Sequence, residues 1–103
     1  MLAGRTTAFL PGAIIAALLL AAGCETMPVQ EMSDARQAIM AAKEAGAAEH
    51  ATETLLAAEE SLQSAEKYLN MHDFAFARRD ALDAKSKAID ALRLSEATRE
   101  SLD

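Results

Sequence analysis

Cys24 is the only cysteine of the chain, and its thiol is the most nucleophilic side chain available for covalent chemistry. A disulfide within the chain is excluded, because the thiol has no partner. The cysteine closes a run of leucines and small residues, Leu18-Leu19-Leu20-Ala21-Ala22-Gly23-Cys24. What the thiol does therefore depends on the segment that precedes it.

The segment before Cys24 has the order of a secretory signal. Arg5 is followed by eighteen uncharged residues, with an apolar stretch at 8–22 and small residues at its end. As a helix, this apolar stretch would span about 22 Å, which is less than the hydrocarbon core of about 30 Å. Pro11 and Gly12 also weaken its first turn. We expect residues 1–23 to be a cleaved signal peptide rather than a permanent membrane span.

The small residues directly before Cys24 resemble the lipobox of bacterial lipoproteins, with Ala21 standing where leucine is usual. The resemblance implies that diacylglycerol alkylates the thiol and that the signal is cut between Gly23 and Cys24. Each buried CH₂ of an acyl chain contributes about 0.8 kcal/mol, so two or three chains make attachment close to permanent. The expected partner is a membrane, reached through the lipid anchor at Cys24.

The mature chain expected from this cleavage is small, acidic and rich in alanine. Residues 24–103 hold nine basic and sixteen acidic residues, a formal balance of −7. An acidic surface repels phosphate backbones, so we expect no nucleic-acid partner. Alanine occupies eighteen of the eighty positions. Because alanine favours helix but buries little area, the composition predicts a slender all-α domain.

Two helices are predicted in the first half of the mature chain. The first runs from about Val29 to Ala45 and ends at Gly46, the last glycine of the sequence. Its apolar face consists of Met32, Ala35, Ile39 and Ala42. The second helix begins near Thr52 and carries a narrow heptad seam, Leu55, Ala58, Leu62, Ala65 and Leu69.

A third helix is predicted from Phe74 to about Thr98, after a turn in which Asn70 takes left-handed backbone angles and Asp73 is the N-cap. Its inner face is a row of alanines, Ala77, Ala81, Ala84, Ala88 and Ala91. A turn this short makes the second and third helices antiparallel. The predicted fold class is all-α: a signal helix, then a short helix and an antiparallel helical hairpin in coiled-coil-like three-helix packing.

These elements divide the chain into four parts. Residues 1–23 are the lipoprotein signal peptide, 24–30 a lipidated tether, 31–99 the α-helical domain and 100–103 a C-terminal tail. The tether contains Pro28 and has no periodic apolar pattern, which suits a connection between lipid and folded domain.

Several short motifs are shared with a known family: the segments 34–38, 45–51, Leu62 with Ala65-Glu66, and 73–78. Through them residues 33–98 resemble the bacterial lipoprotein family known as domain of unknown function 4398. Family members show Tyr at His50, Pro at Thr52 and Gly-Asp-Tyr at His72-Asp73-Phe74. The resemblance implies a periplasmic lipoprotein with a helical hairpin, and it implies no catalytic residues.

Large apolar side chains gather at the turn between the second and third helices: Tyr68, Met71, Phe74 and Phe76. They either plug the end of the hairpin over the first helix or form a partner-binding tip held away from the membrane. Tyr68, Phe74 and Phe76 are the candidate partner-binding residues. Phe76 is the best of them, because it lies two positions from Phe74 and cannot share its face.

The two histidines, His50 and His72, have Glu49, Glu53 and Asp73 nearby. A metal site normally needs three or four converging ligands, and these residues do not supply them. We expect solvated helix ends, no metal and no cofactor. The sequence also lacks a nucleophile paired with a base and a Gly-rich phosphate loop, so we expect no enzyme activity.

The function that best fits these features is a non-enzymatic envelope lipoprotein, an acylated helical hairpin that serves as a spacer, structural subunit or protein-interaction module in the periplasm. Its helices are expected to bind a protein partner or to self-associate.

Two alternatives remain: a lipoprotein that binds peptidoglycan non-covalently, and a small periplasmic carrier of metal or ligand. Covalent attachment to the wall is disfavoured by the ending Glu100-Ser101-Leu102-Asp103, which lacks a basic residue. We expect the outer rather than the inner membrane, although the acidic Glu25 follows Cys24.

Overall fold

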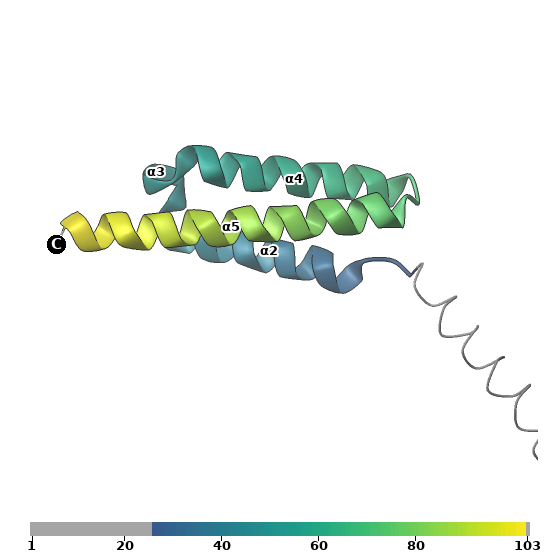
Figure 1. Cartoon of the computed structure of the whole chain (residues 1–103), viewed down its shortest axis with the longest axis horizontal. Helices are drawn as coiled ribbons and strands as arrows, with labels where there is room; N and C mark the ends of the chain where they lie inside the picture. The colour runs from purple at the N-terminus through teal and green to yellow at the C-terminus, as the bar shows by residue number, and fades with distance from the viewer. Residues whose placement is uncertain (1–25, 103) are drawn as a thin grey trace, which may run out of the picture.

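The computed structural model describes residues 26–102, which form α2 (Val29–Glu44), α3 (Ala47–His50), α4 (Thr52–Asn70) and α5 (Phe74–Leu102). Every regular element of this described part is helical (Figure 1), so the predicted all-α class is confirmed. The predicted signal peptide, Gly23 and Cys24 lie outside the described residues.

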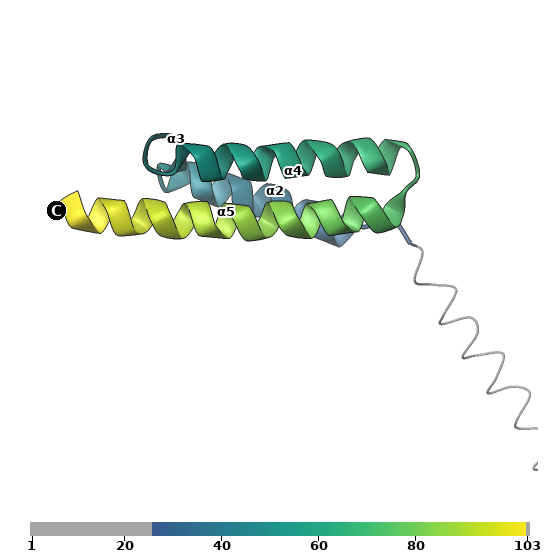
Figure 2. The same cartoon turned by 45° about the horizontal axis from the view of Figure 1, so that its top comes forward.

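The three long helices lie side by side with their axes nearly aligned (Figures 1 and 2). α4 and α5 form the predicted antiparallel hairpin. α2 runs parallel to α5: Glu31 pairs with Arg78, and Asp34, further along α2, pairs with Lys85, further along α5. The start of α2 and the turn between α4 and α5 therefore share one end of the bundle. We call this the turn end and define it as residues 26–31 and 67–80.

The core is built on the alanine row of α5. Its inward positions are fully buried: Ala77, Ala81, Ala84, Ala88, Ala91 and Ser95. The larger side chains come from the other two helices, with Met32 and Ile39 on α2 and Leu55 on α4. α5 packs against both of these helices, whereas α2 and α4 touch each other less. Large residues thus meet small ones across both contacts.

The heptad seam of α4 is buried to different depths along its length. Leu55, Ala58 and Ala65 are buried, while Leu62 and Leu69 are only half-buried. Both half-buried leucines pack against the part of the core that contains Met32 and Ala65. The predicted seam is therefore present, but its partner helices cover it completely at only some of its positions.

Charged pairs join all three helices at the surface. Lys43 bonds to Glu59 and Arg36 to Glu66 between α2 and α4, at 3.0 and 3.5 Å. On α5, Asp83 and Lys87, which are four residues apart, pair at 2.7 Å. Each exposed pair contributes about 0.2–1 kcal/mol, so the pairs align the helices more than they hold them together.

Asp83 also links α5 to α4. Lys87 and the Ser61 hydroxyl both donate hydrogen bonds to its carboxylate, and these bonds hold the pKa of Asp83 below its ordinary value. The charged form is therefore favoured in the folded state. Its contribution to stability is present above the ordinary carboxyl pKa and is lost as the pH falls through the lowered one.

Gly46 ends α2 as predicted. Its φ of 91° lies in the left-handed region, and its N–H donates to the Lys43 carbonyl at 3.0 Å. α4 then begins at Thr52, but the threonine does not cap it. The Thr52 hydroxyl instead donates to the Ala48 carbonyl at 2.8 Å and joins α4 to the single turn of α3.

The turn after α4 differs from the prediction in one residue. His72, with φ of 60°, takes the left-handed conformation, and the expectation for Asn70 was wrong because Asn70 is the last residue of α4. The His72 and Asp73 N–H groups donate to the Leu69 and Tyr68 carbonyls at 3.0 and 2.9 Å. This is the Schellman pattern, which places the left-handed residue two positions beyond the position predicted. Asp73 is the N-cap as predicted, accepting the Phe76 N–H at 3.5 Å.

The last helix of the described chain is longer than the sequence suggested. α5 continues to Leu102 instead of ending near Thr98, because no glycine or proline follows Gly46 to stop it. At the other end, α2 begins at Val29 as predicted, and the Pro28 side chain is fully buried. The predicted tether of residues 24–30 therefore overlaps α2 at 29–30, and Pro28 packs against the bundle. Among residues 26–102, no helix has the length and apolar content needed to cross a bilayer.

Because α5 packs closely on both neighbours, enlarging its inner face should separate the helices. We expect Ala88→Leu to lower the free energy of unfolding by about 1–3 kcal/mol through overpacking. Ala97→Leu makes the same chemical change at an exposed position of the same helix and should change stability little. Thermal unfolding followed by circular dichroism measures both. Equal effects of the two variants would contradict the close contact.

His72 can be tested against Asn70 as the left-handed residue of the turn. Glycine takes positive φ without steric cost, so His72→Gly should raise the free energy of unfolding by a few tenths of a kcal/mol up to about 1 kcal/mol. Asn70→Gly should lower it by a few tenths, because glycine is the poorer residue in a helix. Denaturant titration of both variants measures the direction in which each one changes the free energy of unfolding. A stabilising Asn70→Gly together with a destabilising His72→Gly would contradict the observed turn.

Candidate interaction surface at the α4–α5 turn

Two aromatic rings from different helices stack at the turn end. Tyr68, in the last turn of α4, and Phe76, in the first turn of α5, have ring centroids 5.2 Å apart and an interplanar angle of 27°. The Arg79 guanidinium carbon lies 4.6 Å from the centroid of Phe76. Stacked aromatic pairs and a cation over a ring each stabilise by about 0.5–1.5 kcal/mol. We call Tyr68, Phe76 and Arg79 the aromatic cluster.

Arg79 is held in this position by its neighbour Asp80. The two side chains form an ion pair at 2.9 Å, and the hydrogen bond to Asp80 raises the pKa of the Arg79 guanidinium. Asp80 in turn accepts a hydrogen bond from Ser64 on α4. The chain of contacts from Ser64 through Asp80 to Arg79 thus fixes the charged edge of the aromatic cluster across the hairpin.

The third predicted aromatic, Phe74, does not join the cluster. Its ring lies 5.8 Å from that of His72, tilted by 32°, and it is half-buried. Phe76 is 44% exposed and stacks on Tyr68, so the two phenylalanine rings have different aromatic partners. Met71, in the turn directly after α4, is 62% exposed. The structure therefore brings together Tyr68 and Phe76 and leaves Phe74 on a different side.

The turn end is also where the chain enters the bundle, which no sequence pattern indicated. Arg78 pairs with Glu31 on α2 at 3.3 Å, and its Nη2 donates to the Thr26 carbonyl at 2.8 Å. Thr26 is two residues after Cys24. A partner-binding tip held away from the membrane stays a prediction, and the structure shows that the described chain begins beside this turn. The reason is the third helix of the bundle, since α2 lies parallel to α5 and starts beside the turn.

Arg78 has a structural role that sequence reasoning missed. It directly follows Ala77, the first buried alanine of α5, and so lies at the edge of the inner face where α2 packs. The only sequence feature of Arg78 that relates to this role is its position next to a buried alanine. Arginines that are simply exposed can have the same feature. Recognising its role requires the position of α2.

The two histidines lie at opposite ends of the bundle. His50 is the last residue of α3, close to Gly46, whereas His72 is in the turn after α4. They cannot contribute to one site. Within residues 26–102, no three His, Cys, Asp or Glu side chains are grouped closely enough to hold a metal ion.

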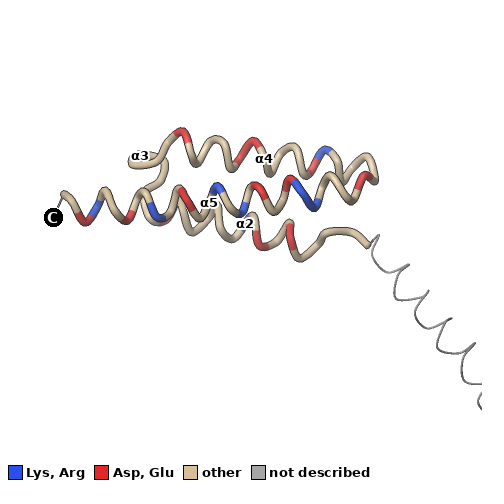
Figure 3. The backbone as a smooth tube through the Cα atoms, in the orientation of Figure 1, with Lys and Arg blue, Asp and Glu red and all other residues tan. Residues whose placement is uncertain are grey.

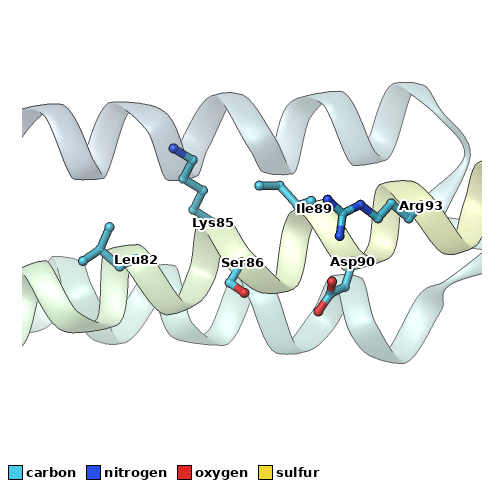
Figure 4. Close-up of a pocket in the computed structure, with 6 residues that line it drawn as sticks. All are labelled: Leu82, Lys85, Ser86, Ile89, Asp90 and Arg93. Carbon is cyan, nitrogen blue, oxygen red and sulfur yellow. The ribbon is translucent and has the colours of Figure 1, made fainter.

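Two shallow hollows occur on the surface of the described bundle. One follows the outer face of α5 and is lined by Leu82, Lys85, Ser86, Ile89, Asp90 and Arg93. Figure 4 shows that Lys85 and Asp90 extend to opposite sides of the helix and do not converge. The other lies between α2 and α4 and is lined mainly by aliphatic carbon of Arg36, Ile39, Met40, Lys43 and Leu62. Neither brings reactive groups together around one point.

Comparison with known proteins finds no match to this chain among protein-family models, curated proteins or solved structures.

The exposure of Phe76 separates a surface role from a role in the core. We expect Phe76→Ala to leave helix content nearly unchanged and to lower the free energy of unfolding by about 1 kcal/mol, the value of the lost stacking. Leu94→Ala is the matched control, because Leu94 is 49% exposed on the same helix and takes no part in the cluster. Leu94→Ala should lower the free energy of unfolding by less than Phe76→Ala does. A loss of about 3 kcal/mol or more for Phe76→Ala in thermal unfolding would make Phe76 a core residue.

Proposed function

We propose that this protein is a non-enzymatic bacterial envelope lipoprotein, attached to a membrane by acyl groups on Cys24 and carrying its helical bundle in the periplasm. The observation that carries the proposal is the run Ala21-Ala22-Gly23-Cys24, which follows a short apolar segment and contains the only thiol. The resemblance to the lipoprotein family with domain of unknown function 4398 points in the same direction. The outer membrane is the proposed location.

The position of the folded domain supports this assignment. Thr26 lies two residues after the proposed acylation site and already accepts a hydrogen bond from Arg78, and Pro28 is buried in the bundle. A lipid on Cys24 would thus be joined to a rigid body with almost no intervening linker. Such a connection transmits the position of the anchor to the bundle, as a spacer or structural subunit requires.

The packing of the bundle supports a structural or binding role rather than catalysis. Its interior is filled by alanine contacts of α5 with larger side chains of α2 and α4. Catalytic sites need a concave pocket with converging polar groups, and the two hollows described above are shallow and open. The surface instead offers long helical faces with exposed apolar residues, including Met40, Leu56, Leu82 and Leu94. Faces of this kind suit docking to another helical protein or to a second copy.

The assignment is tested by removing the thiol. The full chain, expressed in a bacterium that acylates lipoproteins, should fractionate with membranes and carry a diacylglycerol-modified Cys24 by mass spectrometry. Cys24→Ala should lose the modification and most of the membrane association, because no other lipid anchor is proposed. Gly23→Ala keeps a small residue before the cysteine and is the matched control, so it should behave as the unchanged chain. An unmodified thiol with the leader still attached would reject the proposal.

A further inference from the structure

We propose that the turn end is the face with which the bundle rests on the bilayer, so that Met71 and the aromatic cluster lie in the headgroup region beside the lipid anchor. The proposal rests on the acylation of Cys24 argued above and goes further, because an anchor alone does not fix which surface of the bundle meets the lipid. Three independent observations define that surface.

The first observation is the length of chain between the anchor and the bundle. The Arg78 side chain holds the Thr26 carbonyl, and Pro28 is fully buried, so the chain is fixed to the turn end from Thr26 onward. Cys24 and Thr26 are separated by two peptide units, which span at most about 7 Å. An acylated sulfur at Cys24 must therefore enter the membrane within about 1 nm of the turn end.

The second observation is the kind of side chain exposed there. Met27, Val29 and Met71 are exposed by 53%, 66% and 62%, and Phe76 by 44%. Tyr68 and Arg79 border Phe76 and supply a phenol and a guanidinium. Exposed apolar side chains edged by tyrosine and arginine match the interface of a bilayer, where apolar groups meet the acyl boundary and polar groups meet the headgroups.

The third observation is the distribution of charge. The turn end contains three basic residues, Lys67, Arg78 and Arg79, and three acidic ones, Glu31, Asp73 and Asp80, so it has no formal net charge. Residues 32–66 contain two basic and seven acidic residues. Figure 3 shows acidic positions along α4 away from the turn. Contact through the turn end keeps this negative charge away from anionic lipid headgroups, whereas contact along the side of α2 or α4 would bring it against them.

The resulting orientation directs the helices away from the membrane. α5 contains 29 residues, and a helix of that length extends for about 43 Å. Leu102, 72% exposed, lies at the end of α5 opposite the turn. The connection through Gly46 and α3 also lies toward that far end, as do the last turns of α5 (Figure 1). The far end is thus the part of the bundle presented to the periplasm.

A single tryptophan tests the orientation, since the natural chain has none. The full chain carrying Met71→Trp is expressed in an acylating bacterium, purified and reconstituted into vesicles of phosphatidylethanolamine and phosphatidylglycerol with a quencher near the headgroup. Leu102→Trp is the matched control, because both positions are exposed and apolar but lie at opposite ends. We expect the fluorescence of the Met71→Trp variant to fall by about half and that of the Leu102→Trp variant to stay nearly unchanged.

The outcomes separate this proposal from the proposed function. Mass spectrometry and vesicle flotation first establish that the variants are acylated and bound. An unacylated protein overturns the proposed function, and this proposal with it. If both variants are acylated and float but Met71→Trp is not quenched, or if Leu102→Trp is quenched equally, the bundle does not rest on its turn end and only this proposal fails. Met27→Trp provides a second probe of the same end, and it should be quenched like Met71→Trp.

Discussion

Close approach along the alanine row of α5 is the constraint on which the rest of the structure depends. The six inward positions from Ala77 to Ser95 are fully buried, although none has a side chain larger than a hydroxymethyl group. Small residues let helix backbones come near each other, but they contribute little buried area of their own. The apolar area must therefore come from Met32, Ile39 and Leu55 on the facing helices. The hairpin of α4 and α5 is thus completed by α2, which supplies part of the core.

The packing of α2 against the α4–α5 hairpin determines where the candidate surface lies. Because α2 covers the side of α5 and runs parallel to it, the chain must enter the bundle beside the α4–α5 turn. Arg78 fixes that arrangement through its bonds to Glu31 and Thr26. The aromatic cluster, the entry of the chain and the neutral turn end then coincide in one place. A hairpin without α2 would leave the same aromatic residues free to lie far from Thr26.

Much of the local structure could be predicted from the sequence, because it depends on short-range patterns of residue types. The apolar faces of the three helices, Gly46 as the end of α2 and Asp73 as the N-cap of α5 are all present as expected. The helix ends that were missed depend on weaker signals. His72 rather than Asn70 is left-handed because α4 continues to Asn70, and nothing in the residue types determines that length. α5 reaches Leu102 because no breaker stops it.

The candidate surface was only half predictable, and the missing half depends on long-range contacts. Residue types alone indicate that Tyr68 and Phe76 gather at the turn, and the structure places them in one stack. The orientation of that stack relative to the start of the bundle depends on a hydrogen bond between residues 52 positions apart, Thr26 and Arg78. Such a bond has no periodicity and involves a main-chain carbonyl, which any residue type could offer. A sequence pattern can therefore indicate the aromatic residues, but their proximity to Thr26 follows only from the packing of α2.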